Sequence, residues 1–384
     1  MTGLAQKLRA VLEGRPAGDL VRELFAGAGV TVGGSAPWDP QVHDERLYAR
    51  VLRDGTLGVG ESYVEGWWDC PALDQMMDRI LRARLDIVVR ESWVLLSQAI
   101  RARVFNLQTA RPFEVGERHY DIGNDLYRPM LGKSMMYTCA YFKDAKTLDA
   151  AQEAKLDLVC RKIGLAKGMR VLDLGCGWGG FASFAAERYG ASVVGYTVSR
   201  EQVAWVAEHH AALPIEIRLD DYRNATGTYD AVVSIGLLEH VGPKNHRGYM
   251  ELCARRVAPG GVIFMHTIGG NQVRAQIDPW FHKYIFPNAV IPTLGQLTTA
   301  MEKILVAEDV QNIGPYYDRT LMAWWENFDA AWPDLRARYG DTFYRQWKFY
   351  LLSSAAAFRA RYLNLYQIVA TLTGAAQPPT ARSS

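Results

Sequence analysis

The residues Val171-Leu172-Asp173-Leu174-Gly175-Cys176-Gly177-Trp178-Gly179-Gly180 place a short apolar run directly before a glycine-rich turn. The apolar run predicts a buried β-strand, and the residues that follow the turn predict a helix. Glycine lets the backbone turn sharply and lets a ligand approach without a Cβ in the way. We therefore expect the strand–turn–helix unit of an α/β fold, with a ligand bound at Gly175 and Gly177.

Apolar strands alternate with helices on both sides of this unit. The sequence predicts strands at 170–174, 192–196, 215–219, 229–235 and 261–266, and helices at 148–163, 181–189, 200–211 and 245–257. This alternation predicts a parallel sheet with helices on both faces. An insertion with two prolines, 284–293, follows the last of these strands, and long aromatic-rich helices are expected over 320–373.

The region before His119 has a different character. Gly breaks and aromatic residues at 51–68 predict short strands or turns, and 73–107 lacks Pro and Gly and predicts a helix. Eight arginines and four acids lie between Arg79 and Arg118, an excess that, with Trp67-Trp68, suggests contact with anionic lipid headgroups. A solvated helix face would also explain the excess. We expect a smaller N-terminal, lipid- or membrane-associated α+β domain at 1–118 and a catalytic domain at 119–384.

Composition narrows the choice of partners and compartment. The chain has 384 residues, of which 49% are hydrophobic and 22% charged, and its net charge of +2 does not favour a nucleic-acid partner. No apolar segment is long enough to span a bilayer, and the first residues do not form a signal peptide, so we expect a cytoplasmic protein. The five cysteines form no CxxC pair, so neither a metal site nor a disulfide is expected.

The details of the glycine-rich turn favour one cofactor over another. A dinucleotide fold would place an acid at the end of the second strand, where this chain has Gly195-Tyr196-Thr197. Instead, Asp173 with Gly175-x-Gly177 resembles the first motif of class I S-adenosylmethionine-dependent methyltransferases. Three further pairs follow strands at the edge where open α/β sheets bind ligands: Thr197 and Gln202 for the ribose, Asp221 and Tyr222 for adenine, and Glu239 and His240 facing the reaction centre.

Motifs along nearly the whole chain resemble those of the cyclopropane-fatty-acyl-phospholipid synthases and their mycolic-acid relatives. They are Gly60-Glu61-Ser62-Tyr63, Gly66-Trp67-Trp68, His119-Tyr120-Asp121-Ile122-Gly123-Asn124-Asp125, Tyr137-Thr138-Cys139-Ala140-Tyr141-Phe142, Glu239-His240-Val241-Gly242-Pro243-Lys244-Asn245, His266-Thr267-Ile268-Gly269, Tyr284-Ile285-Phe286-Pro287-Asn288, Thr320-Leu321-Met322-Ala323-Trp324 and Ala357-Phe358-Arg359-Ala360-Arg361. The resemblance implies a class I methyltransferase (Rossmann-like) domain behind a smaller N-terminal domain, and a homodimer.

The same resemblance implies two sets of site residues. The cofactor set comprises Tyr137, Thr138, Asp173, Gly175, Gly177, Thr197, Gln202, Asp221 and Tyr222. The second set, which would hold a bicarbonate ion at the catalytic centre, comprises Cys139, Glu239, His266, Ile268 and Tyr317. Cys139 could instead be a buried small hydrophobe, but its Tyr-Thr-Cys-Ala-Tyr context favours a site role. Glu239 could instead be a solvated loop acid, but its position beside the cofactor favours a site role. Only the family pattern selects Tyr317 over Tyr316.

We therefore expect an enzyme of lipid biosynthesis that acts at the inner face of the membrane as a peripheral protein. It would transfer a methylene group from S-adenosylmethionine to the cis double bond of an unsaturated phospholipid acyl chain, forming a cyclopropane ring through a carbocation that bound bicarbonate deprotonates. The alternatives are a methyl- or methylene-branching methyltransferase on the same lipids, a small-molecule N- or O-methyltransferase, which the N-terminal domain argues against, and a non-catalytic lipid-binding protein.

Overall fold

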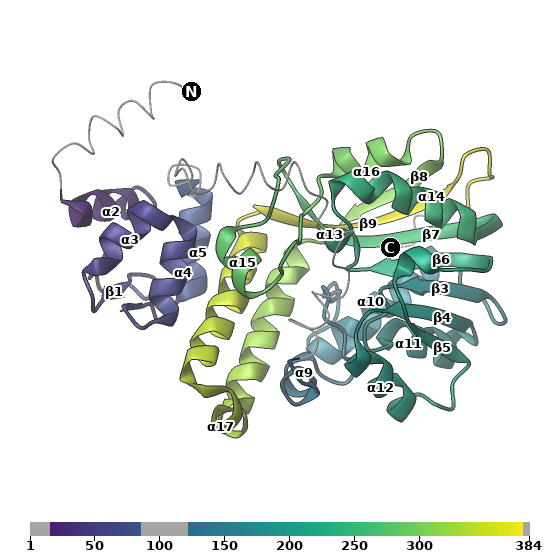
Figure 1. Cartoon of the computed structure of the whole chain (residues 1–384), viewed down its shortest axis with the longest axis horizontal. Coiled ribbons are helices and arrows are strands. Elements are labelled where there is room, and N and C mark those ends of the chain that lie inside the picture. Colours follow the sequence, from purple (N-terminus) through teal and green to yellow (C-terminus); the bar gives the residue numbers. More distant parts are fainter. Residues whose placement is uncertain (1–15, 86–121, 379–384) are drawn as a thin grey trace.

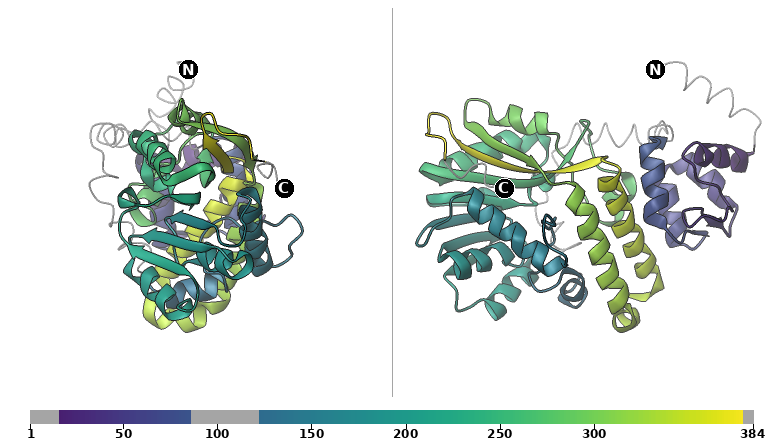
Figure 2. Two further views of the ribbon diagram at one scale, coloured as in Figure 1. Left: turned by 90° about the vertical axis from the view of Figure 1, so that its right-hand side faces the viewer. Right: turned by 180° about the vertical axis from the view of Figure 1, so that it is seen from behind.

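The computed structural model describes residues 16–85 and 122–378. A group of short helices from the N-terminal region lies at one end of the molecule, and a twisted sheet covered by helices lies at the other (Figure 1). A pair of long antiparallel helical arms stands between them, and the view from behind shows the same arrangement (Figure 2, right). The helical arms therefore connect the N-terminal helices with the sheet.

The sheet has seven strands in the order β5-β4-β3-β6-β7-β9-β8. The first five in this order pair in parallel, and β9 is antiparallel to both of its neighbours. The predicted α/β fold is confirmed, but the expectation of a wholly parallel sheet is wrong. The bounds are β3 (Arg170–Leu174), β4 (Ser192–Thr197), β5 (Ile215–Leu219), β6 (Tyr229–Ile235), β7 (Val257–Gly270), β8 (Leu305–Asn312) and β9 (Leu363–Leu372).

Strand β3 shows how the sheet is covered on both faces. Val171 packs with helices α10 (Leu148–Lys162) and α11 (Gly180–Tyr189), whereas Leu172 and Leu174 pack with α14 (His246–Arg256) and α16 (Leu294–Met301). Because side chains alternate along a strand, Asp173 shares the face of Val171, beneath α10. The other shorter helices of the catalytic region are α9 (Asn124–Leu131), α12 (Arg200–His209), α13 (Leu238–Val241) and α15 (Pro279–Tyr284).

The long helical arms are the two halves of α17 (Pro315–Arg359). Gly340 has non-helical angles, φ 75° and ψ 161°, and the chain reverses there (Figure 1). The expectation of long aromatic-rich helices over 320–373 is confirmed for the residues that belong to α17, up to Arg359. It is wrong for residues 363–372, which form β9, because a short apolar run cannot be told from a buried helix by its pattern alone.

The N-terminal region is mainly helical in its described part. It contains α2 (Ala17–Ala26), β1 (Gln41–Val42), α3 (Arg46–Asp54), α4 (Thr56–Val64), β2 (Trp68–Asp69) and α5 (Leu73–Arg82). The prediction of strands or turns at 51–68 is wrong over most of that range, which α3 and α4 occupy. Helix α3 buries one side, whereas α4 is packed on more than one side, with Gly58 against Arg50 and Gly60 against Trp280. Helix α5 ends at Arg82 and Arg84 has a positive φ, so the predicted helix is interrupted there. Its continuation to residue 107, and the domain boundary at 118, lie outside the described residues.

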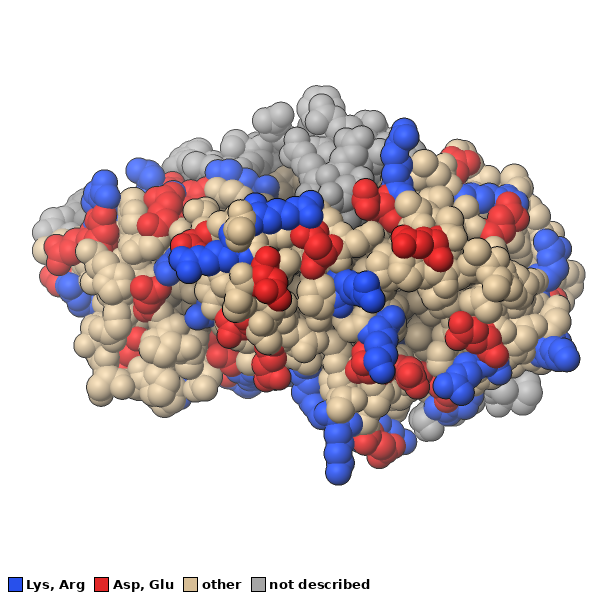
Figure 3. All heavy atoms as spheres, turned by 90° about the horizontal axis from the view of Figure 1, so that it is seen from below, with Lys and Arg blue, Asp and Glu red and all other residues tan. Residues whose placement is uncertain are grey.

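The two tryptophans do not form an exposed anchor. Trp68 is 2% exposed and donates its indole N–H to Ser62 Oγ at 3.1 Å. Trp67 lies against the guanidinium groups of Arg46 and Arg50, at 4.7 and 4.8 Å from the ring centre. Both rings therefore stabilise the N-terminal helices. Most of the arginine-rich stretch lies outside the described residues, and described acidic and basic side chains are mixed on the face in Figure 3. Within 16–85 and 122–378, no helix has the length and apolarity needed to cross a membrane.

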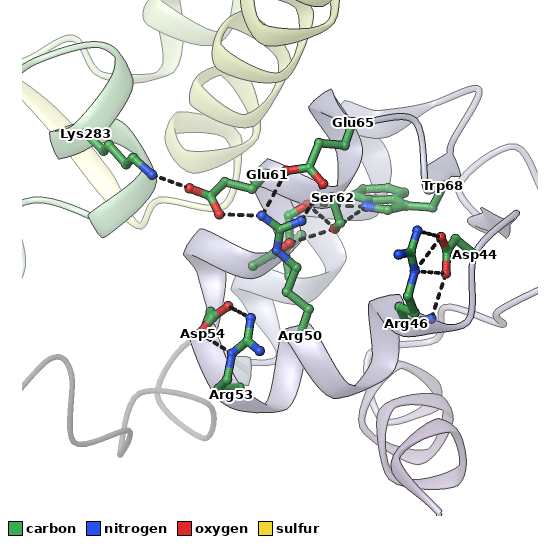
Figure 4. Close-up of polar contacts among 12 residues, drawn as sticks. Asp44, Arg46, Arg50, Arg53, Asp54, Glu61, Ser62, Glu65, Trp68 and Lys283 are labelled. Atoms are coloured by element: carbon green, nitrogen blue, oxygen red, sulfur yellow. Dashed lines mark hydrogen bonds and ion pairs between the residues drawn. The ribbon is translucent and has the colours of Figure 1, made fainter.

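The N-terminal helices dock onto the catalytic region through α4. Glu61 accepts hydrogen bonds from Lys283 Nζ at 2.6 Å and from the hydroxyl of Tyr284 at 2.8 Å, and Arg50 holds its other oxygen at 2.6 Å (Figure 4). A Cβ at Gly60 would lie 2.3 Å from the Trp280 ring, so only glycine permits this approach. The Gly60-Glu61 part of the first motif is therefore a docking surface.

Candidate active site

Two adjoining cavities open at the carboxyl ends of the parallel strands. The smaller is about 170 Å³ and the larger about 680 Å³. They share four lining residues: Tyr137, Thr138, Gly236 and His240. Open α/β sheets bind ligands at this edge, so the geometry suits a ligand in each cavity with its reactive end at the shared wall.

The smaller cavity is lined by all nine residues predicted for the cofactor: Tyr137, Thr138, Asp173, Gly175, Gly177, Thr197, Gln202, Asp221 and Tyr222. Gly177 has a φ of +57°, and a Cβ there would meet no protein atom within 4 Å. By contrast, a Cβ at Gly180 would lie 2.5 Å from the carbonyl oxygen of Ser134. Gly177 therefore keeps space open in the cavity, whereas Gly180 serves packing.

The polar groups at the ends of β4 and β5 are already partly engaged. The Thr197 hydroxyl donates to Gln202 Oε1 at 2.5 Å, which leaves the amide N–H groups of Gln202 as the donors for a ribose. Arg223 binds both carboxylate oxygens of Asp221, at 2.8 and 2.7 Å. Because an ionised carboxylate has about four lone-pair sites, Asp221 can still accept a hydrogen bond from an adenine amino group.

An acid and an imidazole with free polar atoms face the larger cavity. Glu239 Oε2 and His266 Nε2 are buried and have no hydrogen-bond partner among the described residues. Burial raises the pKa of Glu239 to about 7. Burial lowers the pKa of His266 well below its usual range, so the imidazole is neutral. These two atoms can bind a small polar group that both donates and accepts hydrogen bonds.

The other three residues predicted for bicarbonate lie differently. Ile268 and Tyr317 line the larger cavity, but the N–H of Ile268 donates to Glu239 Oε1 at 2.6 Å and is not available to an ion in this arrangement. Cys139 is fully buried outside the cavity lining, with Sγ 3.3 Å from the carbonyl oxygen of Ala140. Burial raises the pKa of Cys139, which therefore remains a thiol. The structure brings four of the five residues to one cavity.

The larger cavity is mostly apolar and extends to the N-terminal helices. Its wall includes aromatic side chains from α15, α17 and the segment between them, and aliphatic side chains from α2, α3, α4 and α5. Sequence reasoning missed Tyr350 in this wall, whose hydroxyl lies 2.8 Å from that of Tyr137. The sequence placed His240 beside the reaction centre but in neither set of site residues, and in the structure it lines both cavities.

Comparison with known proteins places this geometry in a family. The sequence profile of the family described as mycolic acid cyclopropane synthetase matches residues 107–368. The chain belongs to this family. It is 45% identical over 351 residues to the cyclopropane-fatty-acyl-phospholipid synthase of Escherichia coli K12, covering 91% of this chain and 92% of that protein. It is 31% identical to the tuberculostearic acid methyltransferase UfaA1 of Mycobacterium tuberculosis, covering 92% and 88% of the two chains.

Solved structures agree. A cyclopropane synthase from Mycobacterium tuberculosis matches with a TM-score of 0.64 at 30% identity, over 67% of this chain and 97% of that one. A coclaurine N-methyltransferase shares the fold, with a TM-score of 0.67 at 21% identity over 82% of this chain and 98% of that one. The predicted family and the assignment as an S-adenosylmethionine-dependent methyltransferase are confirmed. The 45% identity to a cyclopropane-fatty-acyl-phospholipid synthase is the argument against a small-molecule N- or O-methyltransferase.

Proposed function

We propose that this enzyme converts the cis double bond of an unsaturated phospholipid acyl chain into a cyclopropane ring, with S-adenosylmethionine as the one-carbon donor. The observation that carries the proposal is the junction of a polar cavity and a larger apolar cavity at Thr138 and His240. A related mycolic acid cyclopropane synthase, 30% identical, was solved with SAH and CTAB together. The 45% identity to a phospholipid-acting relative supports the phospholipid substrate.

The arrangement suits a reaction between a weak nucleophile and a strong electrophile. An alkene attacks a sulfonium methyl group only if the two are held in line and water is excluded. Transfer of the methyl group leaves a carbocation on the acyl chain, and loss of a proton from the added carbon closes the ring. The aromatic faces of Tyr317, Phe349, Tyr350 and Phe358 in the larger cavity would stabilise that cation.

We propose that a bicarbonate ion bound by Glu239 and His266 takes this proton. The support is chemical: each of these residues has a buried polar atom without a described partner, and bicarbonate can both donate and accept hydrogen bonds. The ion could donate to Glu239 Oε2 and accept from the Nε2–H of the neutral His266, whose Nδ1 faces the amide nitrogen of Gln367, while Tyr317 lies in the same cavity. Cys139 and the Ile268 N–H would contribute only if their present contacts change.

Lipid profiling of cells that express the gene tests the reaction. We expect each converted acyl chain to gain the mass of one CH₂ unit and to show ring protons at high field in the NMR spectrum. Methyl branching of the acyl chain is the alternative reaction, because one relative is named as a tuberculostearic acid methyltransferase. A saturated methyl branch differs in mass from the ring, and a methylene branch has the same mass but olefinic NMR signals. Either result would replace the cyclopropane proposal.

Activity assays in buffer stripped of carbon dioxide test whether bicarbonate is the base. We expect wild-type activity to fall without bicarbonate and to return when it is added. Glu239→Gln should lose turnover by roughly a hundredfold with little change in cofactor affinity, because removing a charge-positioning group typically costs that much. A wild type indifferent to bicarbonate would show that a side chain is the base. Peripheral membrane association and a homodimer also remain proposals, which vesicle sedimentation and light scattering would test.

A further inference from the structure

A lysine lies buried behind the wall that separates the two cavities. Lys155 on α10 is 0% exposed, and its Nζ is 3.1 Å from Thr138 Oγ1. It forms no ion pair within 4.0 Å among the described residues. Lys162, two turns later on the same helix, is equally buried but pairs with Asp309 at 3.1 Å. The second lysine has a structural partner, whereas the first points to a residue of the site.

The contact with Lys155 fixes the direction of the Thr138 hydroxyl. A protonated lysine can only donate, so it gives a hydrogen bond to Thr138 Oγ1 and leaves the threonine O–H to donate elsewhere. The Thr138 methyl group lies close to Gly236, where an added Cβ would come within 2.8 Å of it. Thr138 lines both cavities. When Lys155 is protonated, which a bound carboxylate favours, the Thr138 O–H is therefore a donor at the junction of the two cavities, backed by a buried positive charge.

An acceptor of opposite charge faces the smaller cavity nearby. Asp173 is 1% exposed, its Oδ2 has no partner among the described residues, and it lies on the sheet face beneath α10. Burial raises the pKa of Asp173 to about 7, partly offset by Lys155, and burial lowers the pKa of Lys155 to about 7. The other titratable groups that interact with Lys155 are Cys139 and His266, both neutral. Lys155 and Asp173 are therefore a buried base and a buried acid beside the smaller cavity, and a zwitterionic ligand bound there would favour the charged form of both.

We propose that Lys155 is a positioning residue for the amino-acid end of S-adenosylmethionine. Through Thr138 it directs a donor to the carboxylate of the cofactor, while Asp173 accepts from the ammonium group of the cofactor. This proposal rests on the proposed function, which supplies the cofactor. The two contacts would orient the sulfonium methyl group toward the larger cavity, where the acyl chain must lie.

Binding of two ligands to two lysine variants tests the proposal. Calorimetry would measure the affinity of S-adenosylmethionine and of decarboxylated S-adenosylmethionine, which keeps the amine and lacks the carboxylate. We expect the wild type to prefer the carboxylate-bearing ligand by roughly tenfold to a hundredfold, the range for a hydrogen bond to a charged group. Lys155→Met should lose most of this preference. Lys162→Met, a matched loss of a buried lysine on the same helix, should keep it.

Thr138→Val removes the hydroxyl through which Lys155 would act, so it should lose the same preference for the carboxylate-bearing ligand. Combining Lys155→Met with Thr138→Val should reduce this preference no further than either change alone. If Lys155→Met fails to fold, the measurement on Thr138→Val still tests the proposal, because an unchanged preference for the carboxylate-bearing ligand in that variant would overturn it. An unchanged preference in the folded variants would overturn the positioning role while leaving the proposed function intact. A wild type that binds neither ligand would overturn the proposed function instead. Loss of affinity for both ligands to the same extent would show a structural role for Lys155 and would also overturn the proposal.

Discussion

At the scale of single residues, the glycines of the turn have two different roles: Gly177 leaves room for a ligand, and Gly180 permits close packing. Gly177→Val should abolish cofactor binding, because the new side chain would enter the open cavity. Gly168→Val is the matched control: Gly168 also has a positive φ and open space at its Cβ, but lies outside both cavities. Calorimetry should show loss of binding in the first variant only. Equal losses in both would mean that backbone strain, and not blockage, explains the effect.

The buried Glu239 should give the protein a measurable pH dependence of stability. Its pKa is about 7 in the folded state and near 4.3 when unfolded, so the folded state binds the proton more tightly. The resulting stabilisation is complete below the unfolded pKa and is lost as the pH rises to about 7. Glu239→Gln removes this loss, so the variant should gain on the order of 3 kcal/mol relative to wild type between pH 4.5 and 8. Urea unfolding at several pH values measures the difference, and a constant difference would contradict the assignment.

Individual site residues differed in how far sequence could predict them. The turn glycines and the polar residues after each strand follow from the rule that ligands bind at the carboxyl ends of parallel strands. Tyr137 and Thr138 were predicted only from the family resemblance, and they line the same cavity. Lys155 could not be found in this way, because a lysine in a helix normally faces solvent and its burial depends on how α10 packs on the sheet. The bond between Ile268 and Glu239 likewise depends on where β7 and α13 meet.

At the scale of elements, the regular alternation of strands and helices was predicted well and the interruptions were not. The strand β9 inserts between β7 and β8 although it comes last in the chain, so its pairing is long-range and has no local signal. The reversal in α17 does have one, because Gly340 adopts angles that essentially only glycine reaches.

Gly340→Ala should destabilise the hairpin of α17 by about 1–3 kcal/mol through backbone strain alone, since no atom lies within 4 Å of the new Cβ. Gly248→Ala, within α14 and with equally open space, should instead stabilise by about 0.5–1 kcal/mol. Chemical denaturation of both variants provides the comparison. If the two changes had the same sign, the non-helical conformation of Gly340 would not be what terminates the first arm.

At the scale of the whole molecule, the wall of the larger cavity is completed by helices that are distant from the catalytic residues in sequence. Thr56 and Val59 on α4 line it together with Phe281 on α15, and these two helices meet at Gly60 and Trp280. None of the described helices α2 to α5 contributes a lining residue to the smaller cavity. Displacing α4 should therefore reduce turnover of the lipid substrate and leave the affinity for the cofactor unchanged.

Gly60→Ala tests this division. The new Cβ would lie 2.3 Å from the Trp280 ring, so α4 and α15 must move apart. We expect turnover on phospholipid vesicles to fall several-fold while the affinity for S-adenosylmethionine stays within about twofold. Lys283→Met is the milder control, because it removes one ion pair with Glu61 that is half exposed and worth about 0–1 kcal/mol. Normal turnover in Gly60→Ala would show that the α4–α15 contact only stabilises the fold. Equal loss of turnover and cofactor affinity would show that the two cavities are not independent, because a shift at the apolar end would then have reached the polar one through their shared wall.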